Sequence, residues 1–166
     1  QSLVHRASMA FGGAQTAAFY YDGLQPSEEM LRRIKSKPDI ARIYDLLDKI
    51  TISISGIGSF YPEPTSPLVN SSYLSSYELQ ELKNEGAYGD ILLRFINETG
   101  CECQTSLKDR TLSISFKDYK KIPCKILVAS GEHKAHTISA ALSGGLADVL
   151  IISEDLAVRL NELLPV

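Results

Sequence analysis

The sequence predicts an α/β fold in which a mostly parallel sheet carries helices on both faces. The first observation is the stretch from Ile126 to Ile152, where two short apolar runs flank a segment with helical spacing. The second is that several other predicted strands lead directly into a helix. Strands and helices that alternate in this way form parallel pairs joined by right-handed crossovers.

The segment between the two apolar runs reads as a complete βαβ unit. The run Ile126–Ala129 is continuous, which predicts a strand buried on both faces. Gly131 allows a sharp turn after it, and Ala135 and Ile138 then recur at helical spacing. Gly144 ends the helix before the second run, Val149–Ile152.

The remaining elements follow from glycine, proline and capping residues. Pro38 suits a first helical position, and Ser75 with Glu78 forms a capping box for a helix that Gly86 ends. Further helices are predicted over Leu3–Phe11, Ser27–Ile34, Pro38–Lys49, Phe116–Ile122 and Glu154–Leu164, and strands over Thr16–Tyr21, Ile50–Ser55, Gly89–Phe95 and Thr111–Ser115. The segment from Phe60 to Tyr73 is rich in proline and serine and is predicted to be a loop.

Composition narrows the class of protein. The 166 residues suit one domain, residues 1–166, and a net charge of −3 argues against direct binding to nucleic acid. No apolar run reaches the roughly 18 residues of a membrane span, and no signal-peptide pattern is present. Three cysteines argue against a disulfide framework. We therefore expect a cytoplasmic protein without a membrane partner.

The start of the chain is unusual for a natural domain. It opens inside an apparent helix, with Leu3 and Val4 already apolar and no strand or cap before them. This predicts an incomplete copy of a domain that lacks its first part.

Candidate binding residues stand where parallel strands end, because ligands of open α/β sheets bind beyond the carboxyl ends of the strands. Gly56 and Gly58 allow close approach of a ligand, or they only make a tight turn. Asp90 could accept hydrogen bonds from sugar hydroxyls, or it is a solvated residue after a helix cap. Lys134 lies near a predicted helix N-terminus, where backbone N–H groups favour an anion; the alternative is a lysine exposed to solvent.

The sequence gives little support for a metal site or for a catalytic nucleophile. His133 and His136 could share a helix face and hold a metal, but only two ligands are visible. Cys101, Cys103 and Cys124 could bind a soft metal, but no fourth ligand is apparent. The sequence has no P-loop, GxSxG or HExxH motif. We predict no metal and no cofactor.

Several segments together carry a resemblance to a known family. They occur in a fixed order: QSLVHRASMAFGG at 1–13, GIGS at 56–59, GAYGDILLRF at 86–95, NETG at 97–100 and the run from Ile122 to Leu160. This order resembles the effector-binding domain of the SorC family of bacterial transcriptional regulators. The resemblance implies a Rossmann-like three-layer α/β/α sandwich, similar to sugar-phosphate isomerases and deaminases.

The resemblance also implies a function and a site. A phosphorylated sugar would bind and change how a separate helix-turn-helix domain engages operator DNA. Lys134 resembles the phosphate-binding lysine of the family, with Gly131 and Glu132 in the turn beside it. Asp90 matches an acidic position that holds sugar hydroxyls. Residues that resemble the strand-end loop and a glutamine close to the ligand are Gly56, Gly58 and Gln1.

Two departures from the family pattern stand out. A DNA-binding domain is absent from these residues, and so is the Gly- and Thr-rich loop that grips a phosphate in relatives. Missing strands would leave a sheet edge or face unpaired, which favours a homo-oligomer. Two other functions stay open: an enzyme of the isomerase or deaminase type, with Asp90 or Glu63 as its base, and a piece that serves only for oligomerisation.

Overall fold

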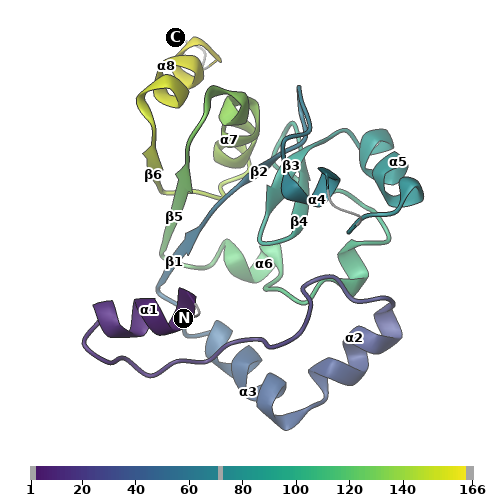
Figure 1. Cartoon of the computed structure of the whole chain (residues 1–166), viewed down its shortest axis with the longest axis vertical. Helices are drawn as coiled ribbons and strands as arrows, with labels where there is room; N and C mark the ends of the chain where they lie inside the picture. The colour runs from purple at the N-terminus through teal and green to yellow at the C-terminus, as the bar shows by residue number, and fades with distance from the viewer. Residues whose placement is uncertain (1–2, 71–72, 164–166) are drawn as a thin grey trace.

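The computed structural model describes residues 3–70 and 73–163, so Gln1 lies outside the described residues. Figure 1 shows the arrangement of the elements, with α1, α2 and α3 in the lower part of the molecule and the strands above them. The helices are α1 (Leu3–Ala10), α2 (Glu28–Lys35), α3 (Pro38–Leu47), α4 (Pro67–Asn70), α5 (Ser76–Asn84), α6 (Phe116–Tyr119), α7 (Ala135–Ser143) and α8 (Glu154–Leu163), with 3₁₀ turns η1 (Lys108–Arg110) and η2 (Glu132–Lys134). The strands are β1 (Ile52–Ser55), β2 (Gly58–Ser59), β3 (Ala87–Ile91), β4 (Arg94–Asn97), β5 (Cys124–Ala129) and β6 (Val149–Ile152).

A parallel sheet of order β1-β5-β6 forms one half of the fold. β5 is the central strand and pairs in parallel with both neighbours, with Ile126 beside Ile54 on one side and Val149 on the other. The α/β class and the βαβ unit from β5 through α7 to β6 are therefore confirmed. Because all three strands are parallel, their carboxyl ends meet at one edge.

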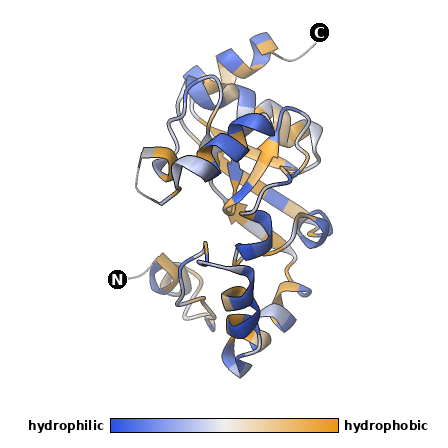
Figure 2. Ribbon diagram, turned by 90° about the vertical axis from the view of Figure 1, so that its right-hand side faces the viewer, coloured by the Kyte–Doolittle hydropathy of each residue, from blue (hydrophilic) through white to orange (hydrophobic). Residues whose placement is uncertain are grey.

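The main core lies on one face of this sheet. Leu127 of β5 is buried together with Ile138 of α7 and with Leu156 and Leu160 of α8. In Figure 2 the strands at the centre of the upper part are mostly hydrophobic, while the surrounding helices carry hydrophilic residues. The expectation that the first apolar run is buried on both faces was wrong, because Val128 is 42% exposed on the opposite face.

A second, antiparallel sheet of order β2-β3-β4 packs beside the first. The sequence predicted one strand over Gly89–Phe95, and the structure instead has the hairpin of β3 and β4. Leu92 and Leu93 form its turn with φ angles of 56° and 63°. Two consecutive residues at positive φ characterise a type I′ turn, a conformation that leucine adopts at a cost in backbone strain.

Most predicted helices are confirmed, whereas two predicted strands are not. The Pro38 helix start and the Ser75–Glu78 capping box are both present. Thr16–Tyr21 forms no strand, because its aromatic residues pack against α2 and α3 without a neighbouring strand to pair with. Thr111–Ser115 contributes only a single bridge, from Thr111 to Leu24.

The turn after β4 packs directly on the end of α7. A Cβ atom built on Gly144 would lie 2.5 Å from the carbonyl oxygen of Gly100, so the two backbones need the absence of a side chain. We expect Gly144→Ala to lower the free energy of unfolding by about 1–3 kcal/mol, as overpacking does. Urea denaturation measures this change, and Ser143→Ala at the exposed neighbouring position serves as the control. Equal stability of the two variants would contradict the contact.

Within residues 3–70 and 73–163, no helix combines the length and the apolar character that a membrane span requires.

Candidate functional site

The turn after β5 forms the first part of the site. Gly131 has a φ of 95°. A Cβ atom built on this residue would lie only 2.6 Å from the ring of His133, so the turn leaves no room for a side chain at position 131. The η2 turn follows, and the half-buried Lys134 is the last residue before α7. Lys134 was predicted near a helix N-terminus and lies at the N-cap position of α7. Its ammonium therefore belongs to the helix N-terminus at the carboxyl end of the central strand.

Two side-chain hydrogen bonds fasten this helix start to the antiparallel sheet. The hydroxyl of Ser59 in β2 donates to the carbonyl oxygen of His133 over 3.1 Å. The hydroxyl of Thr137 in α7 donates to the carbonyl oxygen of Tyr88 in β3 over 2.7 Å. Ser59 and Thr137 are both fully buried. The position of Lys134 relative to β3 is consequently fixed by buried contacts.

Asp90 forms the second part of the site, on the strand opposite Gly58. Its carboxylate accepts a hydrogen bond from the Ser66 hydroxyl over 3.3 Å and another from the backbone N–H of Leu93. Burial raises the pKa of Asp90 to about 6, although these two hydrogen bonds and the Lys134 charge favour the ionised form. Asp90 is only 8% exposed, and the charge of the Lys134 ammonium acts on its carboxyl group.

Gly58 is required by this arrangement. A Cβ atom on Gly58 would lie 2.1 Å from Oδ1 of Asp90 and 2.8 Å from Oγ of Ser66. The carboxylate therefore occupies the space that a side chain at position 58 would need. Close approach of a polar group is one of the reasons for which a strand end carries glycine.

The structure brings some of the predicted site residues together and separates others. Lys134, Asp90 and Gly58 gather at one place, and Gly131 shapes the turn that leads to Lys134. Gly56 is exposed at the end of β1. A Cβ atom built on Gly56 would have the carbonyl oxygen of Val128 as its nearest neighbour, at 3.9 Å. The roles of all these residues stay predictions.

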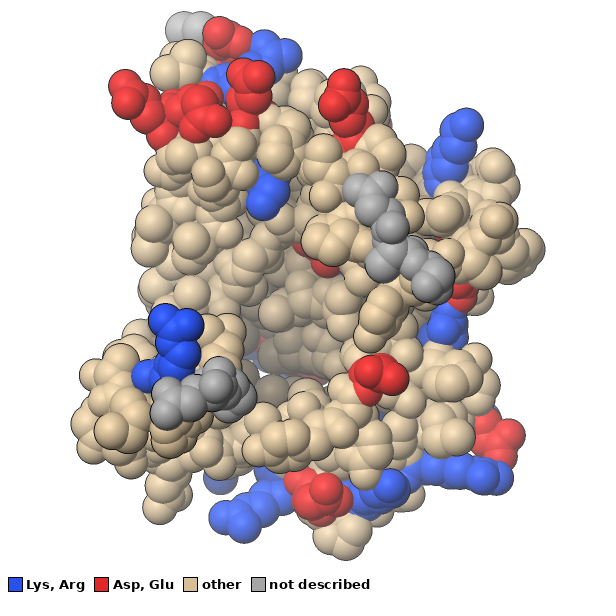
Figure 3. All heavy atoms as spheres, in the orientation of Figure 1, with Lys and Arg blue, Asp and Glu red and all other residues tan. Residues whose placement is uncertain are grey.

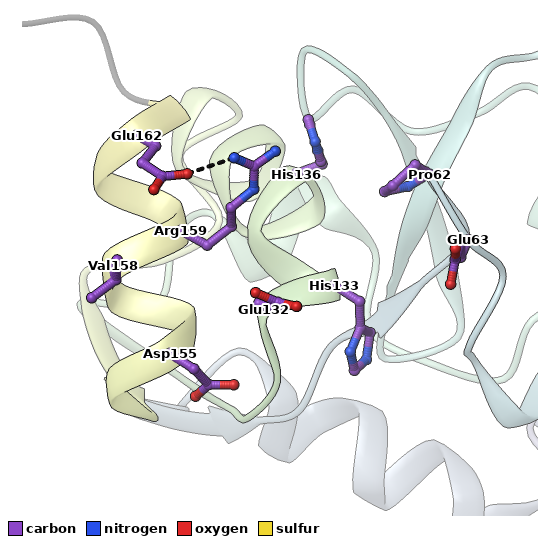
Figure 4. Close-up of a pocket in the computed structure, with 9 residues that line it drawn as sticks. All are labelled: Pro62, Glu63, Glu132, His133, His136, Asp155, Val158, Arg159 and Glu162. Carbon is purple, nitrogen blue, oxygen red and sulfur yellow. Dashed lines mark hydrogen bonds and ion pairs between the residues drawn. The ribbon is translucent and has the colours of Figure 1, made fainter.

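Glu132 faces a different place, an open pocket of about 470 Å³ between α8, η2 and the loop after β2 (Figure 4). The carboxylates of Glu132 and Asp155 lie near each other in Figure 4, and Arg159 pairs with Glu162 across the upper part. The full lining is Pro62, Glu63, Glu132, His133, His136, Asp155, Val158, Arg159 and Glu162. With four carboxylates against one arginine, this pocket is unsuited to a phosphate.

The structure adds residues that sequence reasoning missed. Ser66 lies in the loop after β2, for which the sequence offered no motif, and Leu93 contributes through its backbone. Ser59 was part of the GIGS segment, but its bond to the helix start could not be read from the chain. Among the residues that the structure describes, no three His, Cys, Asp or Glu side chains gather as a metal site would require.

Comparison with known proteins gives three matches of interest. A protein family with the description "Putative sugar-binding domain" matches residues 1–161. The deoxyribonucleoside regulator of Bacillus subtilis (strain 168) is 31% identical over 129 residues, which are 78% of this chain. A transcriptional regulator from Streptococcus pneumoniae TIGR4 has a similar structure, with a TM-score of 0.86 and 25% identity over 97% of this chain and 60% of that chain.

A fourth comparison concerns the fold alone. The full-length sorbitol operon regulator SorC from Klebsiella pneumoniae superposes with a TM-score of 0.80 at 23% identity, over 92% of this chain and 51% of that one. The chain spans 40% of the length of the Bacillus subtilis regulator.

Proposed function

This chain belongs to the sugar-binding domain family that matches residues 1–161, and on that premise we propose that it senses an effector for a bacterial transcriptional regulator. The family match and the shared fold confirm the resemblance to the SorC regulators. The curated relative from Bacillus subtilis is itself a regulator. In our proposal the effector is a phosphorylated sugar, and a separate helix-turn-helix domain reads operator DNA.

One observation supports this effector class above others. Lys134 lies at the N-cap of α7, and its charge acts on the buried carboxyl group of Asp90. An ammonium beside backbone N–H donors suits a phosphate dianion. A carboxylate acceptor such as that of Asp90 suits the hydroxyls of a sugar. We propose Gly58 as the close-approach position and Gly131 as the turn that exposes the N–H groups.

The supporting roles of the other predicted residues are part of the same proposal. Gly56 would border the ligand from the end of β1. Glu132 would contact the ligand from the side of the neighbouring acidic pocket. Gln1 resembles a glutamine close to the effector in the family. We further propose that the protein works in the cytoplasm, where phosphorylated sugars are found, and that it acts as a homo-oligomer.

Binding and turnover measurements distinguish this proposal from the enzyme alternative. The purified protein is titrated calorimetrically with a panel of sugar phosphates, with the parent sugars and inorganic phosphate as references, and each mixture is then analysed for product. We expect heat of binding for at least one sugar phosphate, weaker binding of inorganic phosphate and no product. Turnover would favour an isomerase or deaminase, with Asp90 as the candidate base. Absence of any binding would contradict both functions.

A further inference from the structure

The loop between β2 and α4 carries a buried serine that contacts the candidate site. Ser66 is only 3% exposed, and its hydroxyl donates a hydrogen bond to Oδ1 of Asp90 over 3.3 Å. Buried polar side chains in proteins are hydrogen-bonded as a rule. The acceptor that this hydroxyl finds is the carboxylate to which we assign the hydroxyls of a sugar.

The backbone holds Ser66 in place independently of its hydroxyl. The N–H groups of Thr65 and Ser66 both donate to the carbonyl oxygen of Ser59 in β2, over 3.0 Å each. The hydroxyl of the same Ser59 donates to His133 at the start of α7. Ser66 is therefore tied to the strand that also fastens the helix start bearing Lys134.

Two hydrogen bonds orient the carboxylate of Asp90 without using all of its acceptor positions. A carboxylate has about four such positions. The Ser66 hydroxyl and the backbone N–H of Leu93 each donate one hydrogen bond to it. The remaining lone pairs are free to accept hydrogen bonds from a ligand.

Ion pairs contribute little to this orientation. Within residues 3–70 and 73–163, Asp90 forms no ion pair shorter than 4 Å. On the face shown in Figure 3, the Lys, Arg, Asp and Glu side chains lie mostly around the outline of the molecule. Because Asp90 is buried, the direction of its carboxylate depends on its neutral hydrogen-bond donors.

We propose that Ser66 is a positioning residue for the effector, whose hydroxyl holds the Asp90 carboxylate in the orientation that accepts hydrogen bonds from the sugar. This proposal rests on the proposed function, because it takes Asp90 as the acceptor of sugar hydroxyls. Ser66 acts through Asp90 and needs no contact with the ligand. Since inorganic phosphate has no sugar hydroxyls, Ser66 contributes to selectivity for a sugar phosphate over inorganic phosphate.

Ser66 also precedes α4, so the alternative is a purely structural role at the start of this helix. The N–H group of Leu68 donates to Oγ of Ser66 over 3.4 Å. Ser115 is a close match, because it precedes α6, donates to the Asp118 carboxylate over 2.6 Å and accepts from the Asp118 N–H over 3.1 Å. Both serines begin a four-residue helix and bind a carboxylate, but Asp118 lies outside the candidate site.

Calorimetric titration of the variants tests the proposal, with the tightest-binding sugar phosphate of the panel and with inorganic phosphate. We expect Ser66→Ala to bind the sugar phosphate about tenfold more weakly, the effect of losing a hydrogen bond to a charged group, and to bind inorganic phosphate as before. Ser66→Thr keeps a hydroxyl and should restore most of the affinity. Ser115→Ala should leave both affinities unchanged, and circular dichroism verifies that each variant is folded.

A pH profile distinguishes positioning from support of the fold. The Ser66 hydrogen bond favours the ionised form of Asp90, so its loss should raise the pKa of this group further. Urea denaturation between pH 4 and pH 9 should therefore show the pH dependence of stability shifted to higher pH in Ser66→Ala, but not in Ser115→Ala.

The outcomes separate this proposal from the proposed function. An unchanged affinity of Ser66→Ala for the sugar phosphate, equal losses for both ligands, a Ser66→Thr variant as weak as Ser66→Ala, or an unshifted pH profile would each overturn the role of Ser66 while the proposed function stands. Absence of binding by the unchanged chain would overturn the proposed function, and the role of Ser66 with it.

Discussion

Lys134→Ala is expected to weaken binding of a sugar phosphate by at least about 30-fold, because it removes the proposed charged partner of the phosphate. Truncating one member of a buried, hydrogen-bonded charge pair typically costs about 2–5 kcal/mol, and each 1.4 kcal/mol is about tenfold in affinity. The helix N-terminus would remain, but N–H groups alone are a weaker anion site than N–H groups with an ammonium. The fold should be unaffected, since Lys134 is only half-buried and forms no ion pair within 4 Å with any other residue that the structure describes.

Calorimetric titration of the variant with a sugar phosphate and with inorganic phosphate measures this loss. Both affinities should fall, because both ligands present the phosphate to Lys134. Lys120→Ala is the matched control, as Lys120 is exposed at the end of α6 and should leave both affinities unchanged. An unchanged affinity for the sugar phosphate after Lys134→Ala would remove this lysine from the site and with it the main support for a phosphorylated effector.

The βαβ unit could be predicted because its signals are local. The run that became β5 and the run Val149–Ile152 are short and continuous, and Gly144 ends the helix between them. The β3–β4 hairpin could not be predicted for the opposite reason. Its turn consists of Leu92 and Leu93, whereas the residues that signal such a turn are Asn and Gly. Two leucines in an apolar run give no sign of a reversal in chain direction.

The candidate site divides in a similar way. Lys134 and Asp90 could be proposed because carboxyl ends of strands and helix starts are visible in the sequence. The contact of Asp90 with Ser66 could not, because it joins a strand to a loop 24 residues away. The exposure of Val128 was also unpredictable, since an apolar run has the same pattern whether one or both faces of a strand are covered.

Asp90→Asn is expected to abolish a large part of the pH dependence of stability. Burial raises the pKa of Asp90 from 3.8 to about 6, so the folded protein binds this proton more tightly than the unfolded chain does. The group therefore stabilises the fold most below pH 4, and this contribution is lost as the pH rises through about 6. The difference between the two pKa values corresponds to about 3 kcal/mol.

Urea denaturation of the two proteins between pH 4 and pH 8 measures this effect. The free energy of unfolding of Asp90→Asn, relative to the unchanged chain, should rise by up to about 3 kcal/mol across this range. Asp109→Asn, at an exposed position, should show a difference in the free energy of unfolding that does not change with pH.

Asp90→Asn also tests the proposed role of Asp90 in binding. At pH 8 it should weaken the binding of a sugar phosphate while leaving the binding of inorganic phosphate unchanged, because inorganic phosphate has no sugar hydroxyls. A pH-independent difference would show that Asp90 does not carry its proton to pH 6, and equal losses for both ligands would contradict its role as the acceptor of sugar hydroxyls.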